Sequence, residues 1–247
     1  MKIYGKHAVQ TALDNPKRVK QIWLAESFKN KKDDPIQVLA LQQRISIRYL
    51  SNKDLDELTS ETAHQGVVAE INPYQFSSLD QLLNLARKKQ EPPFLLLTDE
   101  LQDPHNLGAI LRTADAAGCH GVIIPKHRAV SLTPGVVKSS AGAIERIPVC
   151  QVTNLAQCIR ELKEEDIWVF GLDSEGKTSY FQADLTIPIA LVVGGEHHGL
   201  RPSTRKLCDL LISIPVPSPE ISLNASVAAG IGIYEVRRQR LLNKSSQ

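Results

Sequence analysis

The apolar run Ile187-Pro188-Ile189-Ala190-Leu191-Val192-Val193 passes directly into the loop Gly194-Gly195-Glu196. The run does not alternate between apolar and polar residues, which is typical of a strand buried on both faces of a parallel sheet. Four further apolar runs lie at residues 94–98, 121–124, 167–172 and 211–216, and helical patterns lie at 106–117, 155–164, 202–209 and 224–242. Strands that alternate with helices predict an α/β domain with a parallel sheet over residues 93–247.

The first 72 residues form a separate pattern. Helical patterns at 7–13 and 35–44 alternate with strand-like runs at 21–25, 45–49 and 66–71, and they predict a small α/β domain. Asn72-Pro73-Tyr74 interrupts this pattern, and a polar helical stretch at 78–90 follows it. We therefore expect a domain at residues 1–72, a linker at 73–92 and a second domain at 93–247.

The formal net charge of the 247-residue chain is only +2, which does not by itself indicate nucleic-acid binding. Basic residues nevertheless gather in four clusters that together could follow an RNA backbone. They are Lys17, Arg18 and Lys20; Lys29, Lys31 and Lys32; Lys126, His127 and Arg128; and Arg237, Arg238 and Arg240. No apolar run reaches the roughly 20 residues of a membrane span, and the N-terminus lacks the apolar core of a signal peptide. We expect a cytoplasmic protein without a membrane partner.

The spacing of cysteine and histidine predicts no metal site. His197 and His198 are adjacent, and adjacent side chains do not face the same way, so we do not expect a metal there. A GxGxxG loop after the strand at 94–98 and a Walker A sequence are both missing, which argues against a dinucleotide or nucleoside-triphosphate site. The cysteines match neither a CxxC pair nor a dense disulfide framework, and we expect buried free thiols; they are Cys119, Cys150, Cys158 and Cys208.

One candidate functional loop opens a predicted helix. Its sequence is Asp103-Pro104-His105-Asn106-Leu107-Gly108-Ala109-Ile110-Leu111-Arg112. Gly108 and Arg112 are four residues apart and share a helix face. The glycine would allow a ligand to approach closely, and the planar guanidinium of Arg112 suits a phosphate or a ribose. The alternative is structural: Asn106 caps the helix, and Arg112 pairs with Asp115 on the surface.

Two later loops carry further candidates. Glu196 follows a buried strand, where it is well placed to face a site, and the adjacent glycines suggest backbone amides around a ligand; the alternative is a tight turn with a solvated carboxylate. In the last loop, the stiff segment Ile214-Pro215-Val216-Pro217-Ser218-Pro219 precedes Ser222-Leu223-Asn224. A helix rich in small residues follows, and such a helix can pack closely against another helix or across a dimer. Asn224 is also a plausible helix cap.

Together, these three loops resemble the signature motifs of the SpoU (TrmH-type) RNA ribose 2′-O-methyltransferases of the SPOUT class. The resemblance implies that the second domain forms a deep trefoil knot that binds S-adenosylmethionine. Its cofactor contacts would come from the backbone around Gly194, Gly195, Ile214 and Leu223. The catalytic and substrate-site residues of the family match Asn106, Arg112, Glu196, Ser222 and Asn224.

The N-terminal part resembles the L30e-like RNA-binding domain of the bacterial 23S rRNA guanosine subgroup. The matching segments are Ile3-Tyr4-Gly5-Lys6-His7-Ala8-Val9 and His64-Gln65-Gly66-Val67-Val68-Ala69. This implies methyl transfer to the ribose 2′-hydroxyl of a 23S rRNA guanosine by a homodimer. Three alternatives remain: a tRNA guanosine 2′-O-methyltransferase, a 23S rRNA adenosine resistance methyltransferase, and a non-catalytic RNA-binding protein. The sequence does not identify the target nucleotide.

The resemblance also implies a catalytic role for Arg112. A ribose hydroxyl is a poor nucleophile, so it needs a base or a group that stabilises the developing alkoxide. Arginine keeps its proton at any ordinary pH, and we therefore expect electrostatic stabilisation, or proton relay through a phosphate, with Asn106 positioning Arg112. Glu196, Ser222 and Asn224 would hold the loop and the ribose.

Overall fold

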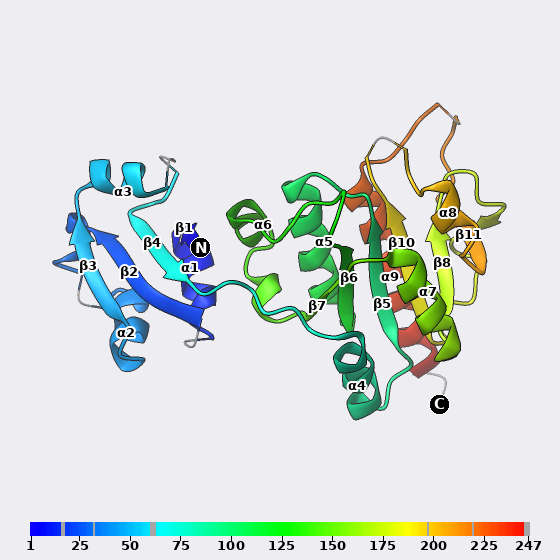
Figure 1. Ribbon diagram of the computed structural model, residues 1–247, viewed down its shortest axis with the longest axis horizontal. Helices are drawn as coiled ribbons and strands as arrows, with labels where there is room; N and C mark the ends of the chain where they lie inside the picture. Colours follow the sequence, from blue (N-terminus) through cyan, green and yellow to red (C-terminus); the bar gives the residue numbers. More distant parts are fainter. Residues whose placement is uncertain (16–17, 32, 60–62, 197, 219, 245–247) are drawn as a thin grey trace. The chain divides into compact units, whose positions relative to one another are not determined.

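The computed structural model describes residues 1–15, 18–31, 33–59, 63–196, 198–218 and 220–244 (Figure 1). These residues form two compact units. Unit 1 comprises Met1–Gln75 and Leu132–Arg146, and unit 2 comprises Phe76–Ser131 and Ile147–Gln247. No helix in the described part of the chain is both long enough and apolar enough to cross a membrane.

Unit 1 is a four-stranded sheet with short helices. Its strands are β1 (Lys2–Tyr4), β2 (Val19–Ala25), β3 (Ser46–Leu50) and β4 (Val67–Ile71), in the order β1-β4-β2-β3. Strand β4 is antiparallel to both neighbours, and β2 is parallel to β3. The helices are α1 (Lys6–Ala12), the short η2 (Glu26–Phe28), α2 (Pro35–Gln42) and α3 (Asn52–Thr59). This confirms a small α/β fold at the N-terminus.

A segment from the middle of the chain also packs within unit 1. It contains α6 (Pro134–Ser139) and the short η3 (Ala143–Glu145). Val136, Val137 and Ile144 are buried, and the buried Glu145 forms an ion pair with Arg18. Burial of these side chains explains why the segment groups with unit 1, although the sequence analysis placed it inside the domain at 93–247.

Unit 2 contains a seven-stranded sheet in which every neighbouring pair is parallel. The order is β7-β6-β5-β10-β8-β11-β9. The strands are β5 (Phe94–Asp99), β6 (Gly121–Pro125), β7 (Val149–Val152), β8 (Trp168–Leu172), β9 (Thr178–Ser179), β10 (Ile189–Gly194) and β11 (Leu210–Ser213). This confirms the predicted parallel α/β domain. The trefoil knot remains a prediction.

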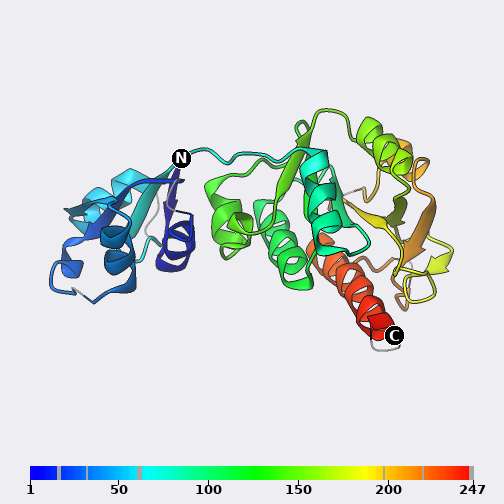
Figure 2. The ribbon, with the colours of Figure 1, turned by 90° about the horizontal axis from the view of Figure 1, so that it is seen from below.

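Helices cover both faces of this sheet (Figure 2). On one face lie α4 (Leu79–Lys89) and α7 (Leu155–Glu164), and on the other lie α5 (Pro104–Ala117) and α9 (Ala225–Lys244); the short α8 (Pro202–Arg205) precedes β11. Alternate strand residues face opposite layers. Leu95, Leu97, Ala190 and Val192 share a core cluster with α4 and α7, whereas a Cβ at Gly232 of α9 would lie 3.0 Å from Leu191.

Helix α4 lies in the predicted linker but belongs to unit 2. Ser78 caps it in a capping box with Gln81, and Leu82 and Leu83 on its apolar face are buried in the core cluster. The helix is therefore part of a packed layer. Its sequence reads as polar because its other face is exposed.

The five strands and four helices predicted after residue 93 are all present; α7 has the predicted bounds, and the others have shifted ends. Helix α5 begins at Pro104, two residues earlier than predicted, because Asp103 accepts a hydrogen bond from the His105 backbone and caps it. Strand β11 ends at Ser213, three residues earlier than predicted. Short elements were missed, among them β1, α3, α6, β7 and β9. Each is eight residues or fewer and carries little periodic signal.

Two arginines of the predicted basic clusters serve the fold. Arg18 is buried against Glu145. Arg240 donates hydrogen bonds to the carbonyls of Pro92, Pro93 and Ile187, at 2.7 to 2.9 Å, and its burial lowers its pKa to about 10. The interpretation of these two as RNA-facing is therefore wrong. Lys17 and Lys32 lie outside the described residues.

The cysteines are free thiols in the structure. Cys119, Cys150 and Cys158 are buried, and Cys208 is half-buried. Burial raises the pKa of Cys119, Cys158 and Cys208 to about 12. This confirms the expectation of unpaired thiols and indicates that these three are poor nucleophiles.

Candidate functional site

The carboxyl ends of four parallel strands meet at one edge of the unit 2 sheet. Asp99 ends β5, Gly194 ends β10, Asp173 follows β8, and Ile214 follows β11. Ligands of open parallel sheets bind at this edge. A pocket of about 380 Å³ lies there, lined by residues 172–175, 193–196, 198 and 199, Arg205, Ile214 and Val216, residues 221–223, Ala225 and Ala228.

A chain of hydrogen bonds joins the three candidate loops beside this pocket. The Asn106 amide nitrogen donates to Glu196 Oε1 at 2.8 Å, and the Asn224 amide nitrogen donates to Asn106 Oδ1 at 3.0 Å. Asn224 Oδ1 in turn accepts bonds from the backbone amides of Ser226 and Val227, at 2.9 and 3.3 Å, and so caps α9. Residues that are about 90 and 118 positions apart therefore hold one another in place.

Glu196 is held as a charged acceptor. Its carboxylate also accepts hydrogen bonds from the backbone amides of Gln102 and Asp103, at 3.3 and 3.2 Å. Partial burial acts to raise the pKa of Glu196, but the bonds from Asn106 and from the backbone amides outweigh it and keep the pKa below its ordinary value. Neither alternative reading of these loops is sufficient, because Glu196 is not simply solvated and Asn106 is not the helix cap.

The two glycines before Glu196 allow close backbone packing. A Cβ at Gly194 would lie 2.1 Å from the Gly199 carbonyl carbon, and a Cβ at Gly195 would lie 2.5 Å from the Glu100 carbonyl oxygen. Both distances are shorter than any side chain tolerates. The loop from Gly194 to Gly199 therefore needs glycine at both positions in order to fold against β5 and back on itself.

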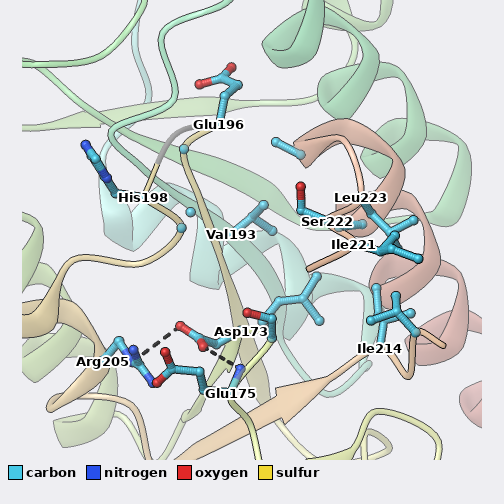
Figure 3. Close-up of a pocket in the computed structure, with 18 residues that line it drawn as sticks. Asp173, Glu175, Val193, Glu196, His198, Arg205, Ile214, Ile221, Ser222 and Leu223 are labelled. Carbon is cyan, nitrogen blue, oxygen red and sulfur yellow. Dashed lines mark hydrogen bonds and ion pairs between the residues drawn. The ribbon is translucent and has the colours of Figure 1, made fainter. Parts of the chain in front are cut away.

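The pocket has ends of different character (Figure 3). Glu196 lies at one end, and an ion-pair group lies at the other, where Arg205 contacts Asp173 Oδ2 at 3.3 Å and Glu175 Oε2 at 2.7 Å. Apolar side chains line the wall between them; they are Val193, Ile214, Val216, Ile221 and Leu223. Such a pocket suits an elongated ligand with a flat apolar part and a polar end.

Sequence reasoning missed a buried ion pair beneath the loop. The Asp99 side chain is fully buried, and Arg201 contacts it with Nε at 2.7 Å, Nη2 at 2.6 Å and the backbone amide at 3.0 Å. This pair ties the chain after Gly199 to the end of β5. The sequence held a signal for Asp99, since this residue ends an apolar strand in the same way that Glu196 follows one.

The predicted site residues fall into three groups. Gly194, Gly195, Glu196, Ile214, Ser222 and Leu223 line the pocket. Asn106 and Asn224 lie beside it in the hydrogen-bond chain. Arg112 is exposed on α5 and does not line the pocket of its own chain, and its side chain has no hydrogen bond or ion pair with any described residue.

The expectation that Asn106 positions Arg112 stays a prediction, and no hydrogen bond joins the two side chains among the described residues. The amide of Asn106 is used by Glu196 and Asn224 instead. His198 lines the pocket, whereas His197 lies outside the described residues. No group of three or more His, Cys, Asp or Glu side chains in the described ranges is arranged to hold a metal ion.

Comparison with known proteins gives matches over both units. The model of the SpoU rRNA Methylase family matches residues 93–234, and that of the RNA 2′-O ribose methyltransferase substrate binding family matches residues 2–77. The TrmH family tRNA/rRNA methyltransferase YacO of Bacillus subtilis is 46% identical over 238 residues, which are 96% of this chain and 95% of that protein. The 23S rRNA (guanosine-2′-O-)-methyltransferase RlmB of Pseudomonas putida is 43% identical over 98% of each chain.

A solved structure is similar to this chain over nearly its full length. The SpoU methyltransferase AviRb of Streptomyces viridochromogenes, in complex with the cofactor AdoMet, superposes with a TM-score of 0.82. It is 28% identical, and the match covers 98% of this chain and 90% of that one.

Proposed function

This chain belongs to the SpoU rRNA methylase family, and we propose that it methylates the ribose 2′-hydroxyl of a guanosine in 23S rRNA. Family membership makes it an RNA 2′-O-methyltransferase that uses S-adenosylmethionine. The Pseudomonas putida relative, which is similar over its full length, supports the guanosine of 23S rRNA as the target. The observation that carries the proposal is the hydrogen-bond chain from Glu196 through Asn106 to Asn224, because it joins all three motif loops at the rim of one pocket.

The residues of the pocket fit S-adenosylmethionine. Its volume of about 380 Å³ lies within the range of small-molecule sites. Leu223 and Ile214 supply apolar surface for a purine, and the close-packed loop at Gly194 and Gly195 brings backbone groups to the pocket wall. When bound, the cofactor supplies a methyl group already activated on a sulfonium. A metal is not needed for such a transfer.

Arg112 is the group we assign to the reacting hydroxyl. Its five N–H donors are not engaged by any described residue, so they are available to stabilise a developing alkoxide. Ser222, at the pocket wall, would position the ribose. Asn106, Glu196 and Asn224 would hold the loops around the ribose. If Arg112→Lys kept most of the turnover, the geometry of the guanidinium would have no role.

A homodimer would bring Arg112 to a pocket. Helix α9 packs against α5. It exposes a row of apolar side chains that are seven residues, or about two helical turns, apart. The row is Val227, Tyr234 and Leu241, each about half exposed. An isologous dimer through this row would bury it and place α5 of one protomer near the pocket of its partner.

Unit 1 would bind the RNA substrate. The substrate-binding family model covers residues 2–77 and the SpoU rRNA Methylase model covers residues 93–234, which supports an L30e-like domain at 1–72 and a catalytic domain at 93–247. Of the predicted linker at 73–92, helix α4 packs within unit 2. We also propose that the protein works in the cytoplasm, where rRNA is assembled into ribosomes.

Methyl transfer to defined RNAs tests this function. Labelled S-adenosylmethionine would be incubated with unmodified 23S rRNA, 16S rRNA and bulk tRNA, with Arg112→Ala as the comparison and nuclease digestion to locate the label. Label on a 23S guanosine ribose that is lost in Arg112→Ala is the expected result. Label on tRNA alone, or on a 23S adenosine, would refute the proposed substrate and keep the chemistry. Cofactor binding without transfer to any RNA, including ribosome-assembly intermediates, would refute the enzymatic proposal.

A further inference from the structure

Two sequence motifs of unit 1 that the catalytic site does not use meet around a second pocket. Gly5-Lys6-His7 opens α1, and His64-Gln65-Gly66 precedes β4. The pocket between them has a volume of about 450 Å³. Its chemistry is set by Lys6, Lys31, Asn52, Asp56 and Gln65, with Phe28 as an apolar side.

The two lysines of this pocket converge on one aromatic ring. Lys6 Nζ lies 5.4 Å and Lys31 Nζ lies 5.1 Å from the centre of the Phe28 ring. Phe28 is buried, so it holds the two ammonium groups by cation–π contact and does not itself offer a free face. Neither lysine has a carboxylate partner among the residues that the structure describes, and both side chains are exposed. Two positive charges are therefore held at the pocket without a direct ion pair to a described carboxylate.

A fixed acceptor lies in the same pocket. His64 Nδ1 accepts a hydrogen bond from the Gly66 backbone amide at 2.9 Å, so in the neutral ring the proton is on Nε2. Nε2 then donates to Asp56 Oδ1, at 2.9 Å. His64 is buried, so this bond fixes the orientation of the Asp56 carboxylate, whose other oxygen remains an acceptor.

The pocket needs the residue types of the motif His64-Gln65-Gly66. Gly66 has a φ of +74°, and a Cβ there would lie 3.0 Å from the Ala25 Cβ and 3.1 Å from the Phe28 ring. Gln65 also has a positive φ of +55°, which is uncommon for a residue other than glycine. Its side-chain oxygen accepts a hydrogen bond from the Lys6 backbone amide at 3.1 Å. The two motifs thus contact each other directly.

We propose that this pocket binds one nucleotide of the RNA substrate, with the phosphodiester beside Lys6 and Lys31 and the donor groups of the base or ribose facing Asp56 and Asn52. The proposal rests on the proposed function, because it takes RNA as the substrate. The Asp56 carboxylate disfavours a small polyanion such as free phosphate in the same space, whereas a diester carries a single charge. A pocket that offers both cationic donors and carboxylate or amide acceptors matches a nucleotide within an RNA strand.

RNA binding by paired variants of the full chain tests the proposal. Lys6→Gln/Lys31→Gln removes the two pocket charges. Lys2→Gln/Lys53→Gln is the matched control, since both lysines are exposed in unit 1, lie outside the pocket, and belong to none of the four basic clusters. The measurements are the KM and kcat for 23S rRNA, the Kd for S-adenosylmethionine, and the dependence of RNA affinity on salt.

The pocket variant should raise KM about tenfold, which is the effect of losing a charge-assisted hydrogen bond, with kcat and cofactor affinity unchanged. Its plot of log affinity against log salt should be shallower by about 0.7 for each lost phosphate contact. If the pocket variant folds poorly, Lys31→Gln alone should raise KM about threefold. If wild-type protein methylates the RNA and the pocket variant has the same KM and salt dependence as the control variant, the pocket proposal is overturned. Wild-type protein that methylates no RNA would instead overturn the proposed function.

Discussion

Replacing Arg201 by methionine would leave a carboxylate buried beneath the pocket without its partner. Asp99 has no exposed surface, and Arg201 supplies two side-chain contacts and one backbone amide to it. Removing one partner of a buried ion pair costs about 3–5 kcal/mol. The backbone donor would remain, and the Arg201 side chain is about one-third exposed, so we expect a loss of about 2–3 kcal/mol in the free energy of unfolding of unit 2.

The two tryptophans allow this loss to be measured in unit 2 alone. Trp23 lies in β2 of unit 1, and Trp168 lies in β8 of unit 2. In a Trp23→Phe background, the fluorescence of Trp168 would follow the urea unfolding of unit 2 without a signal from unit 1. The matched control is Arg160→Met, because among the described residues the Arg160 side chain has a hydrogen bond only to the exposed Gln157, at 3.4 Å. We expect that control to change the free energy by less than about 0.5 kcal/mol.

A double-mutant cycle separates the ion pair from other effects of the substitution. Asp99→Asn removes the charge that Arg201 neutralises, so Asp99→Asn/Arg201→Met should be more stable than the sum of the two single changes predicts, by about 1–2 kcal/mol. The Kd for S-adenosylmethionine should rise in Arg201→Met, because the loop that lines the pocket is released from β5. Full additivity, or a loss below about 1 kcal/mol in Arg201→Met, would refute the reasoning.

Three further predictions follow from single groups. Because the pKa of Glu196 is lowered in the folded protein, its contribution to stability is present above the ordinary glutamate pKa and is lost as the pH falls through the folded value; Glu196→Gln should flatten this acid limb in pH-dependent urea unfolding. Arg240→Met should cost about 2–3 kcal/mol, because buried carbonyls lose their donor, whereas the exposed Arg237→Met should cost little by the same assay. Tyr234→Glu should give a monomer by light scattering that still binds S-adenosylmethionine but transfers no methyl group, and an active monomer would contradict the dimer.

Five strands of unit 2 were predictable because each is a continuous apolar run, and a run of that kind is stable only when both of its faces are buried; the short β7 and β9 are not such runs. Their order was not predictable. Strand β10 lies between β5 and β8, and nothing in its composition specifies its neighbours, since Leu, Val and Ile pack equally well against any apolar layer. That order is what brings Glu196 to the loop after β5. The motif residues could be identified along the chain, but their partners depend on the sheet order.

Unit 1 was harder to read from local patterns. The helix at α3 is short and polar, and Leu55 is its only fully buried side chain, so it gives almost no periodic signal. The segment that contains α6 has buried apolar residues, but along the chain it lies between two stretches of unit 2. Its contacts with unit 1 include the ion pair of Glu145 with Arg18, which are 127 positions apart, and charge pairs so far apart along the chain cannot be assigned from sequence.

The hydrogen bonds of the three loops limit the catalytic roles that their residues can have. The Asn106 side-chain oxygen accepts a hydrogen bond from Asn224, and its amide nitrogen donates one to Glu196. The Asn224 side-chain oxygen accepts a hydrogen bond from the first turn of α9. The Glu196 carboxylate already accepts three bonds, and its lowered pKa makes it a weak base at neutral pH. These three residues are therefore best suited to positioning the loops. Arg112, with no described partner, keeps its donors for the substrate, so the loss of turnover in an Arg112 variant should exceed that in Glu196→Gln at saturating cofactor.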